Sequence, residues 1–367
     1  MSPIFVGSDS SNSRIRSDRI GFAASTTNPG SAAEGDGYYN STDDQLKVYD
    51  GSAWNAIQGS GTFEAVASGT LANGQPVVIN TDGTISGVST SAVTQSAGIG
   101  YRSTPGGTGQ YTDYAYIGSN KIVAVYSDGS NNYYGTAVVG TISGNTITFG
   151  TPVVFHSYRV NYTSVVYDSG NDRIVVSFGD GNQGGASSGN GKSRVGQVSG
   201  TSITFGTLTQ FHGGNTAYID STYDSTSGKI VISFEDFTAN YGKVCIGEIT
   251  AGTTNITFGS DTKYHGNSNV TTSAVEFDPS TNRIFVAFRN WGDNNNNWGV
   301  VGQISGTSVS FGTATVTNTD AQGDITSAYD PNSQRISLAY YDARNNDIGK
   351  SYTVSINPSN NTYSASS

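Results

Sequence analysis

One short phrase recurs five times in the second part of the chain, and it constrains the fold more than any other feature. Each copy begins with Lys or Arg, continues through β-branched and aromatic residues, and ends with Asp or Asn. The first residues of successive copies are 52, 56, 54 and 52 positions apart, and the copies are Lys121–Asp128, Arg173–Asp180, Lys229–Asp236, Arg283–Asn290 and Arg335–Asp342. A period of this size, built from short strands, is typical of a propeller or a solenoid array.

Each repeat divides into four predicted strands, which in the second copy span roughly 163–168, 173–180, 192–199 and 202–212. The first two form a hairpin, in which Asp168 caps the turn through its side chain and Arg173 opens the next strand. The fourth strand carries a Phe-Gly pair, and its glycine predicts a bulge or a close approach of neighbouring backbone. The four glycines are Gly150, Gly206, Gly259 and Gly312.

Four antiparallel strands per repeat predict the blade of a β-propeller. An open solenoid is the alternative, but it needs polar capping repeats that the sequence lacks. We therefore predict an all-β protein with a five-bladed β-propeller over residues 91–367. The segment Gln95–Ser103 reads as the end of a fourth strand, with Tyr101 matching Phe155, and we expect it to join the fifth blade and close the propeller.

The N-terminal part has a different organisation. Residues 1–35 are polar and rich in Gly, Ser and Pro, and we interpret them as an extended anchoring arm. Residues 36–90 predict a small β-hairpin module and a connector, with turns at Asn40–Asp44 and Asp50-Gly51 and a further hairpin within 74–90. Such a small unit needs a partner, or a copy of itself, to pack on.

Composition argues against several classes of function. The net charge is −10 and no dense basic stretch is present, which argues against nucleic-acid binding. No apolar run reaches membrane-spanning length, so no membrane insertion is expected, and the first residues lack the pattern of a signal peptide. Cys245 is the single cysteine, and we predict that it is a small buried hydrophobe.

Two groups of residues suggest metal sites, but their positions favour structural roles. His156, His212 and His265 each follow an aromatic residue at the end of a fourth strand, so they should lie on separate outer strands, too far apart to share a zinc ion. The Asp- and Asn-rich loops after the second strands have the oxygen ligands that calcium prefers, but not the EF-hand spacing. We expect turn capping there and no cofactor, with calcium as the alternative.

Catalysis has little support in the sequence. Only five Glu residues are present, and nothing arranges an acid–base pair of the kind that glycoside hydrolysis needs. We therefore predict that the protein is not an enzyme. The loops between second and third strands instead carry aromatic side chains among amides and hydroxyls, a combination that suits sugars. The candidate ligand-binding residues are Tyr133, Tyr134, Phe237, Tyr241, Trp291 and Trp298; the alternative is that they only cover the ends of the blades.

Two stretches resemble known virion proteins. Ile20-Gly-Phe, Asn28-Pro-Gly-Ser and the residues from Glu34 to Trp54 resemble the N-terminal module of tailed-phage structural proteins, especially marine phage fibres. Residues 195–207, with the hairpin before them, are similar to tandem repeats in marine phage and metagenomic virion proteins. Five-bladed tachylectin-type lectins share the predicted architecture, but their binding motif is not recognisable in this chain.

This resemblance implies a non-enzymatic structural protein on the virion surface, either a tail fibre or another surface fibre. Residues 1–60 would contact other virion proteins, and the propeller would contact glycan on the host surface. The resemblance to phage fibres also suggests a homo-oligomer, with a trimer as the specific expectation. A head decoration protein without a ligand is the second reading, and a glycan hydrolase is the third.

Overall fold

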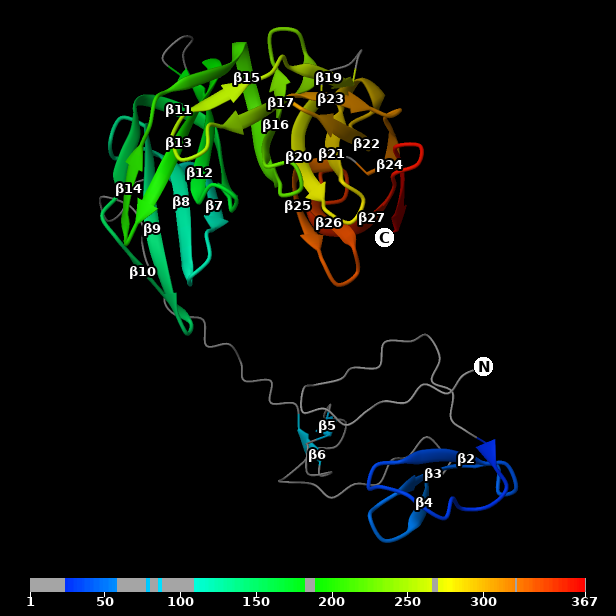
Figure 1. The fold of residues 1–367 in the computed structure, drawn as a ribbon. Helices are drawn as coiled ribbons and strands as arrows, with labels where there is room; N and C mark the ends of the chain where they lie inside the picture. The colour runs from blue at the N-terminus through cyan, green and yellow to red at the C-terminus, as the bar shows by residue number, and fades with distance from the viewer. Residues whose placement is uncertain are drawn as a thin grey trace. The chain divides into compact units, whose positions relative to one another are not determined.

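The computed structural model describes residues 24–57, 77–79, 85–87, 109–181, 189–265, 270–320 and 322–366 (Figure 1). Within these ranges the protein is all-β and contains no α-helix; one short 3₁₀ turn, η2, spans Trp291–Asp293. The chain divides into two compact units, Met1–Val93 and Thr94–Ser367. No helix among the described residues is long and apolar enough to span a membrane.

The smaller unit contains a four-stranded sheet in the order β1-β2-β3-β4. The strands are β1 (Ala24–Ser25), β2 (Gly37–Asn40), β3 (Gln45–Tyr49) and β4 (Trp54–Ile57). Strands β2 and β3 form a hairpin around the predicted turn, whereas β1 pairs with β2 in parallel, so part of the predicted arm belongs to the sheet. Trp54 packs edge-on against Tyr38, with ring centroids 4.7 Å apart. A second hairpin joins β5 (Val77–Ile79) to β6 (Ile85–Gly87).

The larger unit consists of five antiparallel repeats, which we number 1 to 5 (Figure 1). The first strands are β7 (Gly109–Tyr116), the second halves of β11 (Val153–Asp168) and β15 (Thr209–Asp224), β20 (Val270–Asp278) and β25 (Gln322–Asp330). The second strands are β8 (Lys121–Asp128), β12 (Arg173–Asp180), β16 (Lys229–Asp236), β21 (Arg283–Asn290) and β26 (Arg335–Asp342), which are the five recurring phrases. The third strands are β9 (Tyr134–Ser143), β13 (Gly189–Ser199), β17 (Tyr241–Ile249), β22 (Asn296–Ser305) and β27 (Ile348–Asn357).

The fourth strand differs from the sequence prediction, because it is two pieces rather than one. A short piece pairs with the end of the third strand, and a second piece pairs with its beginning. The short pieces are β10 (Thr146–Phe149), β14 (Ser202–Phe205), β18 (Ile256–Phe258), β23 (Ser308–Phe311) and β28 (Thr362–Ser366). The second pieces are the first halves of β11 and β15, then β19 (Thr262–His265) and β24 (Thr315–Asn318).

The glycine between the two pieces lies against the next repeat, as the sequence predicts. A Cβ atom on Gly206 would lie 2.3 Å from the carbonyl oxygen of Thr254, in the turn between the third and fourth strands of repeat 3. On Gly259 it would lie 2.1 Å from the same atom of Thr307, in repeat 4. Only hydrogen fits at such distances, so this glycine sets how closely successive sheets pack.

Asp side chains cap the hairpins between first and second strands. The Asp168 carboxylate accepts hydrogen bonds from the backbone N–H groups of Gly170 (2.9 Å) and Asn171 (3.0 Å). Arg173 faces Asp168 in the strand register, but its guanidinium donates to the carbonyl oxygens of Asn171, Asp172 and Thr253. Asp168 and Arg173 are therefore paired in the strand register, but their side chains do not form the predicted ion pair. The Arg173 side chain instead connects repeat 2 to repeat 3.

Apolar faces of successive repeats form the core. Val123 and Val125 of repeat 1 pack with Ile174 and Val176 of repeat 2, and all four are fully buried. Similar clusters join repeats 2 and 3, 3 and 4, and 4 and 5. Cys245 is buried in the cluster that joins repeats 2 and 3, as predicted, and burial raises the pKa of its thiol to about 12. The first strands lie side by side in chain order, from β7 to β25.

Repeats 1 and 5 end this series. In β26 the residues alternate between exposed and buried, because only one of its faces packs on repeat 4. No strand pairing joins repeat 5 to repeat 1 among the described residues. The segment Gln95–Ser103, which we expect to close the propeller, lies outside the residues that the structure describes.

Candidate functional site

The loops that follow the second strands lie at the end of the larger unit where the first strands begin. Backbone hydrogen bonds connect the two sets of segments: Val160 donates to Tyr133 (3.1 Å), and Phe237 donates to Asn215 (2.9 Å). All six aromatic residues predicted from the sequence lie in these loops or at the first residues of the third strands. We call this end of the unit the loop face.

Three of the predicted aromatic residues have a cation over the ring. The guanidinium of Arg159 lies 4.4 Å from the ring centre of Tyr133, and the ammonium of Lys263 lies 3.2 Å from that of Tyr241. The guanidinium of Arg289 lies 5.5 Å from the ring of Trp291. Cation–π contacts of this kind orient an aromatic ring at a surface.

The predicted aromatic residues differ in accessibility. Phe237 and Trp291 are exposed, at 47% and 55% of their surface. Trp298 is half-buried: its indole N–H donates to Asp293 (2.9 Å), and its ring packs on His265. Tyr134 is half-buried and opens β9. The structure therefore collects the six residues at one end of the unit, but within its described residues no ring contact joins those of different repeats into one cluster.

Asp236, the acidic residue at the end of the second strand of repeat 3, has a structural role. Asp236 accepts from the N–H groups of Thr238 and Ala239 and pairs with Lys243 at 3.0 Å. Burial alone would raise the pKa of Asp236, but Lys243, the backbone N–H groups and His212 together lower it. His212 contacts both Asp236 and Asp261. Turn capping at this position follows the sequence prediction.

The three histidines lie in separate repeats, each beside its own acid or amide. His156 contacts Asp180 at 3.1 Å, and His265 contacts Asn290 at 3.1 Å. Burial lowers the pKa of His156 and of His265. In the described part of the chain, no three His, Cys, Asp or Glu residues are grouped so that they could hold a metal ion.

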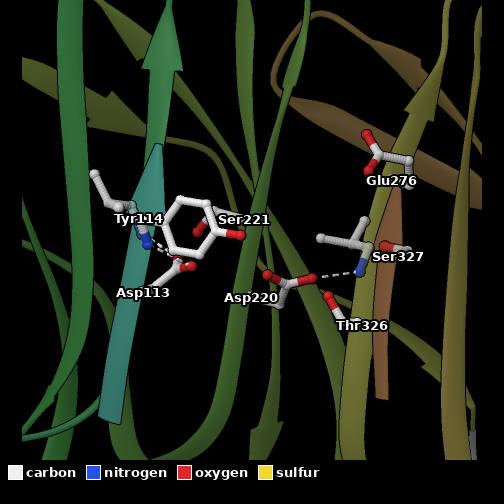
Figure 2. A pocket seen from close by; sticks show the side chains of 9 residues that line it. Asp113, Tyr114, Asp220, Ser221, Glu276, Thr326 and Ser327 are labelled. Carbon is white, nitrogen blue, oxygen red and sulfur yellow. Dashed lines mark hydrogen bonds between the residues drawn. The ribbon is translucent and has the colours of Figure 1, made fainter. Parts of the chain in front are cut away.

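A polar cavity of about 280 Å³ lies between the first strands, and all five of them line it (Figure 2). Three carboxylates face it: Asp113 from β7, Asp220 from β15 and Glu276 from β20. Asp113 accepts from the N–H of Val165 (2.7 Å), and Asp220 accepts from the N–H of Val275 (2.8 Å). These bonds replace a strand ladder between neighbouring repeats, so the carboxylates tie the first strands together.

Burial is the main cause of the raised pKa values of the carboxyl groups in this cavity. Burial, with smaller contributions from the nearby carboxylates of Asp113 and Glu276, raises the pKa of Asp220 to about 8. Burial also raises the pKa of Asp113 and of Glu276. Carboxyl groups with raised pKa can act as general acids, but these three already serve as acceptors for the backbone or for Thr222.

A row of tyrosines on the loop face has no counterpart in our sequence predictions. Tyr111, Tyr162 and Tyr218 occupy the same position in repeats 1, 2 and 3, two residues before the cavity position of Asp113 and Asp220. Their rings stack in sequence, with centroids 4.8 Å and 5.0 Å apart. The recurrence of Tyr at one repeat position could have indicated this row from the sequence, although it does not indicate the backbone conformation of these residues.

Glu235 lies beside this row. It pairs in register with Ala217, the residue before Tyr218, and only 2% of its surface is exposed. Its Oε2 atom is buried without a hydrogen-bond partner among the described residues. Burial raises the pKa of Glu235 to about 7, while Arg289 opposes the shift.

Comparisons with known proteins add information about fold. No protein-family model matches this chain, and no curated protein matches it. A crystal structure of a protein of unknown function from Dyadobacter fermentans is similar, with a TM-score of 0.52 at 12% identity over 72% of this chain and 84% of that one. A Bacteroides uniformis protein, described as a candidate 6-phosphogluconolactonase, has a TM-score of 0.48 at 11% identity over 69% of each chain. The first of these likenesses concerns the fold alone, and the second is too weak to support an argument.

Proposed function

We propose that the larger unit is a closed five-bladed β-propeller, in which repeat 5 meets repeat 1. The cavity supports this proposal, because β7 and β25 line it together with the three first strands between them. A linear stack would hold the first and last repeats apart. The alternating exposure of β26 is consistent with this proposal, because its exposed face would be the surface on which repeat 1 packs.

Repeat 5 also lacks half of its fourth strand within the described residues. Strand β28 pairs only with Thr353–Asn357, which leaves the first half of β27 without a partner on that edge. In repeats 2 and 3 the second piece of the fourth strand places an aromatic ring over a glycine of the third strand. A Cβ atom on Gly191 would lie 2.5 Å from Phe211, and one on Gly242 would lie 2.2 Å from Tyr264. The matching Gly349 has open space around it. We assign this edge to residues 95–103, with Tyr101 over Gly349.

A double-mutant cycle tests this assignment. Tyr101→Ala and Gly349→Val should each destabilise the protein, and the double variant should lose less than the sum of the two, since both remove the same contact. The measurement is urea unfolding of the full chain. Strictly additive effects would place Tyr101 elsewhere.

The proposed function is host-surface contact by a non-enzymatic virion protein. Residues 1–60 would attach the chain to other virion proteins, and the loop face would bind glycan. The observation that carries the binding role is the grouping of aromatic rings, several with a cation over them, at one end of successive repeats. Aromatic faces bury the apolar side of a sugar ring, and the nearby amides supply hydrogen bonds. Weak contacts of this kind gain strength in a homo-oligomer, for which a trimer is our expectation, through avidity.

Polysaccharide binding by the full chain tests this role. The double variant Phe237→Ala with Trp291→Ala should weaken binding to the host polysaccharide in a glycan array or by calorimetry. Tyr116→Ala is the matched control, because Tyr116 is also an exposed aromatic (58%) but lies at the opposite end of β7. No binding to any host polysaccharide at millimolar ligand would favour the second candidate, a head decoration protein without a ligand.

Two further measurements separate the remaining readings. A chain that begins near residue 90 should fail to incorporate into particles if the N-terminal residues anchor the protein; normal incorporation would contradict that role. Release of sugar products from host polysaccharide would identify a hydrolase instead, and the half-buried carboxylates of the cavity would then be the first residues to substitute.

A further inference from the structure

Four repeats hold a non-glycine residue in left-handed backbone at the same position. The φ angles are 49° at Tyr111, 51° at Tyr162, 47° at Tyr218 and 41° at Thr272, each at a break in register between the first and second strands. This conformation costs about 1 kcal/mol or more for a residue with a Cβ atom. Strain that recurs in four repeats is specified by the fold, and strained residues are concentrated at ligand sites.

The break in register places the tyrosine rings of repeats 1, 2 and 3 next to one another at the loop face. All three side chains are half-buried, and their rings form one tilted stack. Burial raises the pKa of Tyr162 and of Tyr218, and the charge of Glu235 adds to both shifts. The rings and this carboxylate are therefore close neighbours.

The Glu235 carboxylate has an acceptor atom in need of a donor. Its Oε2 is buried and unpartnered, whereas each cavity carboxylate accepts a hydrogen bond. Leaving a buried acceptor unsatisfied costs about 1–3 kcal/mol. A water molecule or a ligand hydroxyl would remove that cost.

Arg289 connects this position to the exposed part of the loop face. Its Nε donates to Thr271 (2.8 Å), and its guanidinium stands beside Trp291. Its charge also affects both Tyr218 and Glu235. A bound molecule could therefore extend from the tyrosines past Arg289 to the exposed indole.

We propose that Tyr162, Tyr218 and Glu235 form the primary sugar subsite of the loop face, and that it selects neutral sugars. This inference rests on the proposed glycan-binding function. The tyrosine rings pack on the apolar side of a sugar, and a sugar hydroxyl donates to Glu235. Acidic sugars are disfavoured, because the carboxylates of Glu235 and Asp324 repel a further negative charge, and Arg289 is the cation that the described residues place beside them.

Calorimetry or ligand-observed NMR with the full chain tests the subsite. The probes are the methyl glycosides of glucose, galactose and mannose, together with methyl glucuronide as the acidic partner of the first. At least one neutral glycoside should bind at pH 8, and methyl glucuronide should bind at least about tenfold more weakly than methyl glucoside. Equal or tighter binding of the glucuronide would overturn the selectivity.

Two substitutions at the strained position separate a binding role from a structural one. Tyr162→Gly removes the ring and also relieves the left-handed strain, so the protein should stay folded while its affinity falls about tenfold or more. Thr272→Gly is the matched control, because it relieves the same strain in repeat 4 without removing a ring, and it should bind as the wild type does. If Thr272→Gly loses as much affinity as Tyr162→Gly, the rings are not the subsite.

Glu235→Gln tests the carboxylate. Affinity in the wild type should fall as the pH drops below about 7, when Glu235 becomes protonated, and the variant should bind about tenfold more weakly with no such pH dependence. An unchanged affinity and pH profile would mean that a water satisfies Oε2 and the subsite lies elsewhere. If host polysaccharide still binds to the Glu235→Gln and Tyr162→Gly variants as to the wild type, the subsite is wrong and the glycan-binding function stands; if it binds to no form of the chain, the function itself fails.

Discussion

Repeats 3 and 5 have nearly the same sequence pattern but very different surroundings. In β16 every residue after Lys229 is buried, whereas in β26 exposed and buried residues alternate. Repeat 3 lies between two neighbours, and repeat 5 packs on repeat 4 through one face only. The sequence differs accordingly at one position of the second strand: the fully buried Val231 of repeat 3 is replaced by Ser337 on the exposed face of repeat 5.

The largest difference is expected for aromatic residues of the two second strands. Phe234 is fully buried, so Phe234→Ala should cost about 3–5 kcal/mol in the free energy of unfolding, because it leaves a cavity. Tyr341 is 36% exposed, and Tyr341→Ala should cost about 1 kcal/mol. Urea unfolding of both variants measures the difference. Equal losses would show that repeat 1 covers the outer face of repeat 5 in solution, as the closed propeller that we propose would place it, whereas unequal losses would mean that this face stays open.

The pH dependence of stability should come from the first and second strands of repeat 3 rather than from repeat 5. The pKa of Asp220 rises from 3.8 to about 8 on folding, and that of Glu235 rises from 4.5 to about 7. The folded protein therefore binds more protons than the unfolded chain over this range, so the free energy of unfolding falls as the pH rises from about 4 to about 8, by up to about 1.4 kcal/mol per pH unit for each group.

Asp220→Asn should flatten this dependence, since the amide keeps an acceptor for Val275 and cannot ionise. Repeat 5 has Thr326 at the matching position, so Thr326→Ala should leave the slope unchanged. Denaturant midpoints at pH 5 and pH 8 provide the measurement. A wild type that is more stable at pH 8 than at pH 5 would contradict the burial of these carboxyl groups.

A side-chain exchange tests the contact between successive repeats. Repeat 5 has Ser366 where repeat 3 has Gly259, whose absent Cβ would meet the backbone of Thr307. Gly259→Ser should therefore destabilise the protein by about 1–3 kcal/mol, since backbone must move to admit the side chain. Ser366→Gly should change stability by less than about 0.5 kcal/mol. Thermal unfolding would reveal a loose interface if Gly259→Ser had no effect.

The smallest difference is expected at the hairpin caps. Asp224 is buried and accepts from the N–H groups of Thr226 and Ser227, so Asp224→Ala should cost about 1 kcal/mol. Asp330 makes the equivalent bonds in repeat 5, where solvent competes for the same groups. Asp330→Ala should lower the melting temperature by less than Asp224→Ala does, and the reverse order would contradict the difference in burial.

Much of the strand arrangement was accessible from the sequence, because it depends on local pattern. The apolar runs and the Asp-to-basic spacing locate the hairpins, and the Phe-Gly pairs mark the contacts between repeats. The division of the fourth strand was missed, since it depends on how each repeat bends toward the next. Whether the five repeats close into a propeller remains a proposal, because the segment expected to close it lies outside the described residues.

The candidate site was predictable only in part. The loop aromatics were found from composition, as their position after a second strand places them at one end of the unit. Tyr162 and Tyr218 were missed because they lie at the start of the predicted first strands, where a tyrosine reads as ordinary packing. Glu235 has no role in the sequence predictions, because the burial of its unpartnered oxygen depends on side chains from other repeats, which spacing along the chain does not bring together.

The glycine contacts between repeats all point the same way along the chain. The glycine of each repeat lies against a turn of the next one: Gly150 against Thr201, Gly206 against Thr254, Gly259 against Thr307 and Gly312 against Asn361. Each inner repeat therefore contributes a glycine to the contact with the repeat after it and a turn to the contact with the repeat before it. Such polarity lets a gene lengthen by tandem duplication, because a new copy inherits both halves of the joint. It also confines tolerated insertions to the loop face, where no such joint is made, and that is the end from which new binding specificities would arise.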